Sequence, residues 1–405
     1  MRVLFTTVAQ STHLYNQVPL AWAMHTAGHE VCIASHPSLE HKIVQTGLTA
    51  VPVGAPLPPA RRLTMADFAY PEPRPAELDW EYMLGKFAVF SGLMFPFYEP
   101  ETLRNELVDF ARAWRPDLVV WDMFSFAGAA AAAACGAAHA RILFGLDLVG
   151  QMRRMFLDLM AQQPQEARDD PLAEWLSWIL PRFGGEFGED LVVGQWTVDP
   201  MPAAMRLPVA GHYEAMRYVS YHGPAPVPAW VREPAERPRV CLTLGLTARE
   251  GWDVSKVPVD ELFEAVADLD AEVVATLSAE QIATLGSRPA NVRLVEFVPL
   301  HALLPSCAAV IHHGGTGTFG TAIVHGVPQV IVPHGFWDTS AKAEYVAANG
   351  AGVHLTDFSA GALRSALLDV LGGGFGAGAG RVRDDMRAQP SPNDLVPVLE
   401  RLSRR

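Results

Sequence analysis

The sequence is poor in cysteine and in basic side chains, and it lacks long uninterrupted apolar runs. Four cysteines occur in 405 residues, far apart and without C-x-x-C spacing. This usage argues against a disulfide framework and favours reduced, buried thiols in a cytoplasmic protein. Lysine and arginine total 31 against 44 aspartates and glutamates, so the formal net charge is −13. Such an acidic balance argues against nucleic acid as the main partner.

The most apolar stretch, residues 124–138, is rich in alanine and too short to cross a bilayer, so we expect no membrane span. Residues 3–8 have the composition of a strand rather than that of a secretory leader, which also favours a cytoplasmic location. Half of the residues are hydrophobic and 19% are charged, as in an ordinary globular chain. At about 100–200 residues per domain, this length predicts two or three domains.

Strand-like and helix-like segments alternate through both halves of the chain. In the first half we expect strands at residues 3–8, 30–35, 50–53, 117–121 and 141–144, and helices at 15–27 and 125–134. In the second half we expect strands at residues 239–244, 272–276, 292–297, 308–311, 329–332 and 353–355. This alternation is typical of parallel sheets covered by helices. The sequence therefore predicts an α/β fold of two Rossmann-like parallel-sheet domains that face each other across a cleft.

Residues 222–238 contain five prolines and separate the two series of strands. Such a composition is typical of a stiff, extended linker between domains. We therefore expect a first domain at residues 1–221, which would bind an acceptor, and a second at residues 239–405, which would bind a nucleotide. The last helix of the chain is a candidate to pack back on the first domain.

A glycine- and threonine-rich loop lies between an apolar strand and a helix in the second half. At a helix N-terminus, unpaired amides and the positive dipole end favour an anion, and glycines let a phosphate approach the backbone. Threonine hydroxyls and a histidine ring add hydrogen-bond donors. A tight turn with a helix cap is the alternative interpretation. The predicted diphosphate site, called the anion loop below, consists of His313, Gly314, Gly315, Thr316, Gly317 and Thr318.

Residues at two other strand ends extend this predicted donor site. Gly245 and Thr247 follow the first strand of the second half and offer a small loop with a hydroxyl group for a phosphate. Phe297 and Val298 end its third strand and offer packing and backbone hydrogen bonds to a planar base. Each of these signals is weak by itself.

Asp338 and Thr339 lie at a further strand end, beside a helix start. They are candidates to bond sugar hydroxyls, with capping of the helix from Ser340 as the alternative. Asp268 and Asp270 have the D-x-D spacing that binds Mg²⁺ in some sugar transferases. Solvent exposure explains that pair more simply, and a helix N-terminus can hold a diphosphate without a cation, so we expect no metal.

His13 and Asp122 each follow a predicted strand of the first half. The loop before His13 has no glycine and the second strand ends without an acid, which argues against an NAD(P) enzyme. Both residues open onto the carboxyl edge of the sheet, where ligands bind in such folds. A carboxylate there can accept one ring N–H of a histidine and leave the other nitrogen free to take a proton. The pair predicts a general base, and helix capping by either residue is the alternative.

Two segments of the first half are dense in aromatic residues and methionine, residues 87–98 and 151–187. Apolar side chains at helical spacing usually form core. Beside a catalytic edge such segments also suit a pocket for a large apolar acceptor, or a surface for a partner helix. The sequence leaves these interpretations open.

Together, His13, Asp122 and the anion loop resemble the GT-B glycosyltransferases that act on nucleotide sugars. Within that family the chain is most similar to the actinobacterial transferases that attach TDP-deoxysugars to macrolide and anthracycline aglycones. The likeness covers nearly the whole length and is strongest from Pro224 to Gly352. Its signatures, besides the anion loop, are residues 239–245, 297–305, 326–329, 383–387 and 389–392.

The resemblance implies an inverting enzyme of antibiotic biosynthesis. It would move a deoxysugar from a TDP-sugar to a hydroxyl of a polyketide or macrolide-type aglycone, without a metal and with no cofactor besides this co-substrate. His13 would deprotonate the acceptor, Asp122 would steady His13, and the anion loop would stabilise the leaving TDP. Many relatives that use glucose have Asp-Gln where this chain has Asp338-Thr339, which favours a donor with fewer hydroxyls.

The resemblance also has implications for protein partners. Several members of the subfamily need an activator that resembles a haem monooxygenase, and we expect such docking at the aromatic-rich segments. A homodimer is a further expectation. The alternative function is a non-catalytic nucleotide-sugar-binding or lipid-binding protein on the same fold, which would have no use for the pair of His13 and Asp122.

Overall fold

The computed structural model describes residues 1–55, 77–245, 258–285, 288–333, 335 and 337–404, and the chain forms two compact units. The first unit is Met1–Arg217 together with Gln389–Arg405, and the second is Tyr218–Ala388. The division falls a few residues before the proline-rich stretch 222–238, which belongs to the second unit. Val231 of this stretch is buried in the core of that unit.

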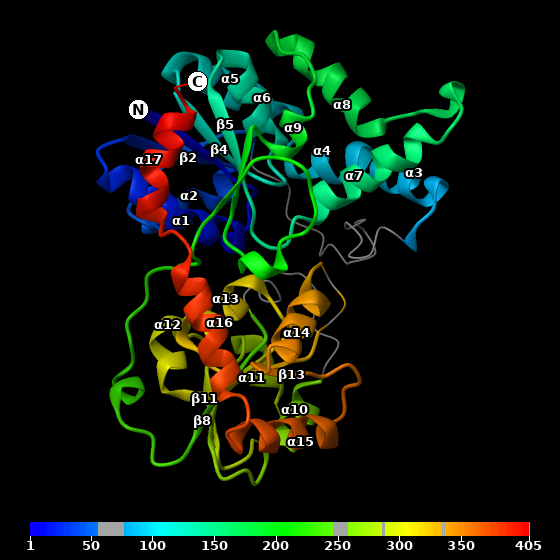
Figure 1. Ribbon diagram of the computed structural model, residues 1–405. Helices are drawn as coiled ribbons and strands as arrows, with labels where there is room; N and C mark the ends of the chain where they lie inside the picture. The colour runs from blue at the N-terminus through cyan, green and yellow to red at the C-terminus, as the bar shows by residue number, and fades with distance from the viewer. Residues whose placement is uncertain (56–76, 246–257, 286–287, 334, 336, 405) are drawn as a thin grey trace. The chain divides into compact units, whose positions relative to one another are not determined.

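The first unit is built on a sheet whose described strands are all parallel, in the order β3-β2-β1-β4-β5-β6-β7 (Figure 1). The strands are β1 Arg2–Thr6, β2 Glu30–Ser35, β3 Thr49–Pro52, β4 Leu118–Asp122, β5 Ala138–Ile142, β6 Trp196–Asp199 and β7 Tyr213–Ala215. The sequence pattern predicted the first five, although it placed β5 at residues 141–144, three residues too late. It missed β6 and β7, which are four and three residues long.

Helices cover both faces of this first sheet. Along α5 (Glu101–Trp114), Leu103, Leu107 and Ala111 recur at helical spacing and pack with α6 (Phe126–Cys135) on one face. On the other side, α1 (Ser11–Thr26) lies against β1 and β2, and α17 (Pro392–Leu402) packs against α1. The remaining helices of the first unit are α2 Glu40–Gln45, α3 Trp80–Val89, α4 Phe95–Tyr98, α7 Leu148–Ala161, α8 Pro171–Ile179 and α9 Asp190–Val193.

Parts of the two aromatic-rich segments belong to the core. A π-helical turn, Phe90–Met94, joins α3 to α4, and the rings of Phe87 and Phe95 are buried. The Phe87 ring contacts that of Phe156 on α7, with ring centroids 4.6 Å apart. Other side chains of these segments are exposed, among them Val89, Leu93 and Trp178.

The second unit has a six-stranded parallel sheet within its described residues, in the order β10-β9-β8-β11-β12-β13. One face packs on α10 (Val259–Val266) and α15 (Ala360–Leu371), and the other packs on α12 (Leu300–Leu303) and α13 (Thr316–His325). Its strands are β8 Arg239–Thr243, β9 Glu272–Thr276, β10 Val292–Val295, β11 Cys307–His312, β12 Gln329–Ile331 and β13 Gly352–His354. Its other helices are α11 Ala279–Thr284, α14 Thr339–Ala348 and α16 Gly376–Ala388.

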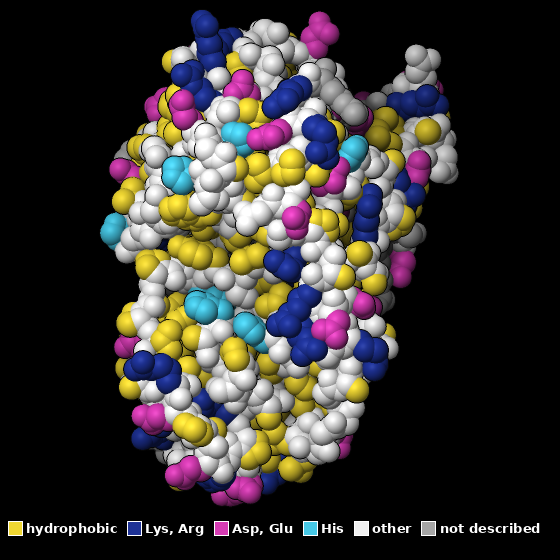
Figure 2. All heavy atoms as spheres, turned by 60° about the vertical axis from the view of Figure 1, so that its left-hand side comes forward, with side chains coloured by type: hydrophobic (Ala, Val, Ile, Leu, Met, Phe, Trp, Pro, Cys, Tyr) yellow, Lys and Arg dark blue, Asp and Glu magenta, His cyan; other side chains and the backbone are white. Residues whose placement is uncertain are grey.

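Charged side chains of both signs are interspersed on the face of the molecule drawn in Figure 2. That face therefore does not display the one-signed basic stripe of a nucleic-acid-binding protein. Within the described ranges, no helix combines the length with the apolar character that crossing a membrane requires.

Candidate active site

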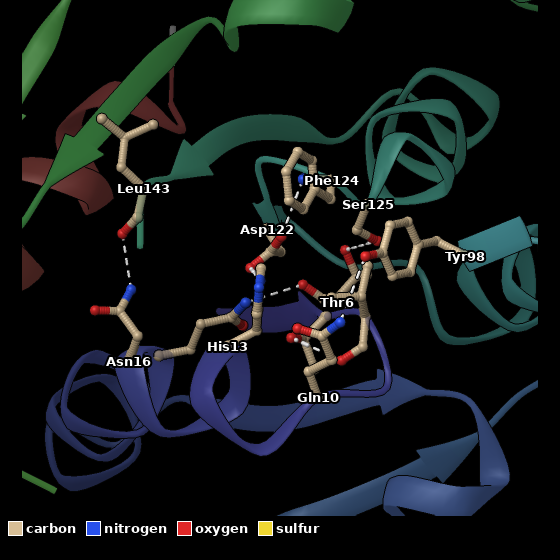
Figure 3. Close-up of polar contacts among 12 residues, drawn as sticks. Thr6, Gln10, His13, Asn16, Tyr98, Asp122, Phe124, Ser125 and Leu143 are labelled. Atoms are coloured by element: carbon tan, nitrogen blue, oxygen red, sulfur yellow. Dashed lines mark hydrogen bonds and ion pairs between the residues drawn. The ribbon is translucent and has the colours of Figure 1, made fainter. Parts of the chain in front are cut away.

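His13 and Asp122 meet at the carboxyl edge of the first sheet (Figure 3). His13 lies in the first turn of α1, and Asp122 is the last residue of β4, which pairs with β1. The ring Nδ1 lies 2.8 Å from the carboxylate Oδ2, and the two side chains are 5% and 1% exposed. If Asp122 is ionised, it accepts from Nδ1–H and the lone pair is on Nε2. The arrangement is that of a general base with an orienting carboxylate.

Asp122 also holds the backbone that follows it. Its Oδ1 accepts from the backbone N–H of Phe124 at 2.9 Å, while Oδ2 serves His13. The carboxylate thus stabilises the turn that leads to α6 and orients the imidazole at the same time. The N-cap of α6 is Ser125, which makes no side-chain cap hydrogen bond.

Aromatic rings surround the imidazole of His13. The Phe144 and Phe124 rings lie 4.1 and 5.8 Å from it between centroids, and Tyr98 stacks on Phe124 at 5.8 Å. Sequence reasoning did not single out Phe124 or Phe144 as site residues. Each comes two residues after a strand end at the predicted ligand edge, which is the signal that could have found them. These rings can contact an apolar acceptor.

A second buried carboxyl lies beside the pair. Glu99 follows α4, and its Oε2 accepts from the backbone N–H of Ala127 at 2.7 Å. Burial raises the pKa of Glu99 to about 7, and the nearby charge of Asp122 adds to that rise. No sequence pattern indicated this carboxyl, because its burial depends on packing between α4 and α6.

The anion loop occupies the N-terminus of α13 in the second unit. β11 ends at His312 and α13 begins at Thr316. The first helical hydrogen bond described here runs from the Phe319 N–H to the Gly315 carbonyl. The amides of residues 316–318 precede this first hydrogen bond in the chain and therefore have no partner within the helix. Gly315 and Gly317 are exposed. The loop therefore presents backbone donors and the positive dipole end to solvent.

Two adjacent histidines in and before this loop differ in role. His312 has its Nδ1 3.0 Å from the Gly314 N–H and its Nε2 2.8 Å from Oε1 of Gln329. These partners fix a neutral ring that accepts at Nδ1 and donates at Nε2. Burial lowers the pKa of His312 to about 3 and that of His313 to about 4. Both rings are neutral near pH 7, so His313 keeps a single N–H donor.

Gly314 is required by its backbone conformation and by its surroundings. Its φ is +89°, in the left-handed region that favours glycine. A Cβ at this position would lie 3.1 Å from both Cβ and the carbonyl oxygen of Thr339. The contact brings the N-termini of α13 and α14 together within the second unit.

Of the other predicted donor residues, Gly245, Phe297 and Val298 follow strands of the second sheet. Gly245 follows β8, which neighbours β11, and its φ is +76°. Thr247 lies outside the described residues. Phe297 and Val298 do not end a strand as predicted, because β10 stops at Val295. The Phe297 ring is 39% exposed and Val298 is buried.

Asp338 is the N-cap residue of α14, which begins at Thr339 rather than at Ser340. Its side chain makes no cap hydrogen bond, so the capping interpretation is wrong for the carboxylate. Its Oδ1 instead lies 2.6 Å from Nζ of Lys342. Sequence reasoning missed Lys342, although its i,i+4 spacing from Asp338 on one helix is a readable signal. Within the described residues, no group of three or more His, Cys, Asp or Glu is placed to hold a metal ion.

Comparisons with known proteins agree with this architecture. Residues 22–245 match the N-terminal domain, and residues 260–402 the C-terminal domain, of the family described as erythromycin biosynthesis protein CIII-like. An aclacinomycin-T 2-deoxy-L-fucose transferase of Streptomyces galilaeus is 50% identical, over 100% of this chain and 96% of that protein. The 3-alpha-mycarosylerythronolide B desosaminyl transferase of Saccharopolyspora erythraea is 46% identical, over 100% of this chain and 98% of that protein.

A solved structure is similar over the whole chain. The crystal structure of glycosyltransferase VinC in complex with dTDP covers 100% of both chains, with 46% identity and a TM-score of 0.91. The resemblance to transferases of macrolide and anthracycline antibiotic biosynthesis is therefore confirmed, as is the predicted α/β fold of two parallel-sheet domains. The chain belongs to the erythromycin biosynthesis protein CIII-like family of glycosyltransferases, and its two parallel-sheet units are those of the GT-B fold.

Proposed function

We propose that this protein transfers a deoxysugar from a TDP-sugar to a hydroxyl of a polyketide or macrolide-type aglycone, with inversion at the anomeric carbon. The observation that carries the proposal is the 2.8 Å contact between Nδ1 of His13 and Oδ2 of Asp122 at the sheet edge. A non-catalytic binding protein on this fold would gain nothing from a buried imidazole oriented in this way. The names of the two transferases above support the donor and acceptor classes.

The chemistry is a single displacement. Nε2 of His13 takes the proton of the acceptor hydroxyl. At the same time, the hydroxyl oxygen forms a bond to the anomeric carbon of the donor sugar. The bond from that carbon to the terminal phosphate oxygen breaks, and TDP leaves with the electron pair. Asp122 stabilises the imidazolium that forms, as a carboxylate does beside a catalytic histidine. Phe124, Phe144 and Tyr98 offer aromatic surface to an apolar acceptor.

The anion loop is the proposed site of the TDP diphosphate. The amides of residues 316–318 and the hydroxyls of Thr316 and Thr318 supply donors for its oxygens. The single N–H of the neutral His313 ring has the Val332 backbone as its partner, so His313 is proposed to shape the loop beside the diphosphate. The exposed ring of Phe297 offers a surface for the base. Asp338 and Thr339 are proposed to contact the sugar. No metal and no other cofactor takes part in this proposal, since the helix dipole and the donors face the developing charge.

Protein partners form a separate part of the proposal. An activator that resembles a haem monooxygenase would dock on exposed apolar side chains of the aromatic-rich segments, among them Val89, Leu93 and Trp178. Self-association as a homodimer is also proposed. Light scattering of the protein alone and with a candidate activator tests both associations.

The experiment that tests the function is a transfer assay with TDP-deoxysugars and a panel of macrolactone and anthracyclinone acceptors. Product mass and anomeric configuration are read by mass spectrometry and NMR. Wild-type protein should form an inverted glycoside and the variant His13→Ala should not, although both bind TDP. TDP binding without transfer to any acceptor, with and without an activator, would favour the non-catalytic alternative. A retained anomeric configuration would exclude the single displacement.

A further inference from the structure

Lys342 is a buried cation next to the anion loop. It lies on α14 and is 1% exposed, whereas lysines are almost always exposed unless paired. Its Nζ lies 2.6 Å from Oγ1 of Thr316 and 2.6 Å from Oδ1 of Asp338. The Phe319 ring lies under it, with the centroid 5.7 Å from Nζ. The ammonium group thus joins the first residue of α13 to the N-cap residue of α14.

Several structural features hold the ammonium group of Lys342 in place. Asp338 is itself 1% exposed, and one helical turn separates it from Lys342. Trp337, directly before it, has φ +53°, a conformation that costs free energy for a residue with a side chain. The contact of Gly314 with Thr339 keeps α13 and α14 close together. Three local features therefore place one positive charge at the base of the anion loop.

The hydrogen bond to Thr316 has a directional consequence. A threonine hydroxyl has one proton to donate, and an ammonium group can only donate. Because Oγ1 of Thr316 accepts from Lys342, its own proton must point elsewhere. Thr316 is partly exposed, and its hydroxyl donates to no acceptor among the described residues. Lys342 thus holds this hydroxyl as a donor toward the open side of the loop.

We propose that Lys342 is a positioning residue of the donor site, which holds and polarises the Thr316 hydroxyl as a hydrogen-bond donor to the terminal phosphate of a nucleoside diphosphate. This inference rests on the proposed function, because it deepens the diphosphate site placed there. Polarisation along a chain of hydrogen bonds strengthens the outer donor. The hydrogen bond from the Thr316 hydroxyl to the phosphate gains strength as negative charge develops on the leaving phosphate. Lys342 therefore affects both TDP affinity and the rate of transfer.

Calorimetric titration with TDP and with TMP tests the inference, because TMP lacks the terminal phosphate. The variants are Thr316→Val and the double variant Lys342→Met with Asp338→Asn, which avoids keeping a buried carboxylate after its ammonium partner is removed. Each should lower TDP affinity about tenfold or more and change TMP affinity less than about twofold. Combining all three substitutions should add little, because residues that act as a unit are not additive. Lys342→Gln, which keeps a donor but removes the charge, serves if the double variant does not fold.

The outcomes separate this inference from the proposed function. If wild-type protein binds no TDP, the donor site itself fails and the inference fails with it. If wild type binds TDP but the Lys342 variants bind it equally well, only the role of Lys342 is overturned. An equal loss of TDP and TMP affinity would also overturn it, since that pattern indicates a general disturbance of the loop. Urea unfolding of each variant identifies such a disturbance independently.

Discussion

The Nδ1 atom of His13 lies 2.8 Å from Oδ2 of Asp122, although 109 residues separate the two in the chain. The parallel pairing of β1 with β4 causes this approach, because both strands end at the same edge of the sheet. The contact makes His13 the first residue to test.

His13→Ala should lower the rate of transfer by about 10²–10⁴-fold, the usual contribution of a general base. TDP affinity should stay within about twofold of wild type, because the substitution lies in the other unit from the anion loop. Kinetics and calorimetry on one preparation measure both quantities. His25→Ala is the matched control, since His25 is an exposed histidine on the same helix. Turnover retained in His13→Ala would refute the base assignment.

Asp122→Asn should lower the rate of transfer by up to about 10⁴-fold with little loss of fold. An asparagine can still accept from the Phe124 N–H through its carbonyl oxygen, but it cannot stabilise an imidazolium as a carboxylate does. The measurement is the transfer rate beside the midpoint of thermal unfolding. An unchanged rate would show that the carboxylate serves only the turn before α6.

The nucleotide preference of the protein should show whether its site is one for a TDP-sugar or one for another nucleotide or a nicotinamide cofactor. Titration with TDP, UDP and NAD⁺ should give tightest binding for TDP and none for NAD⁺. His313→Ala should weaken TDP binding by about threefold to tenfold, because it removes a hydrogen bond between the ring and the Val332 backbone that orders the loop. Absence of binding for both diphosphates, even with a partner protein added, would remove the main support for a transferase.

Glu99→Gln should change how stability depends on pH. The pKa of Glu99 is raised by burial from 4.5 to about 7, so the folded state holds a proton that the unfolded state releases between these values. The stability that Glu99 contributes is therefore fully present below pH 4.5 and is lost as the pH rises through 7. Relative to Glu99→Gln, wild type should lose about 3 kcal/mol of unfolding free energy between pH 4.5 and pH 8.

Urea unfolding of wild type and Glu99→Gln at pH 5 and pH 8 measures this difference. Glutamine keeps an acceptor for the Ala127 N–H, so the comparison isolates the ionisation. Parallel pH profiles for the two proteins would contradict the raised pKa.

Gly314→Ala should destabilise the protein by about 1–2 kcal/mol through its left-handed backbone alone, and contact with Thr339 adds to this. Gly315→Ala is the matched control for stability. Its φ is −59° and a Cβ there would meet nothing within 4 Å. Equal unfolding free energies for the two variants would show that the loop relaxes around residue 314.

Much of this architecture was readable from the sequence because its signals are local. The alternation of short apolar strands with helices follows from hydrophobic period and turn residues, and it predicted the two parallel-sheet units. The same reasoning predicted that His13 and Asp122 share a sheet edge and that the anion loop opens a helix. Their catalytic and binding roles stay predictions. The strands β6 and β7 were missed.

By itself, then, the sequence determined the α/β class and the strand ends at which functional side chains lie, because backbone propensity and side-chain period act over a few residues. Only the tertiary structure decided several contacts between distant residues. The Phe144 ring contacts the His13 ring, the Glu99 carboxyl accepts from the backbone of α6, and Lys342 donates to Thr316. Burial and hydrogen-bond direction depend on packing between elements distant in the chain. For that reason the pKa of Glu99 and the orientation of the Thr316 hydroxyl follow from the fold and from no local pattern.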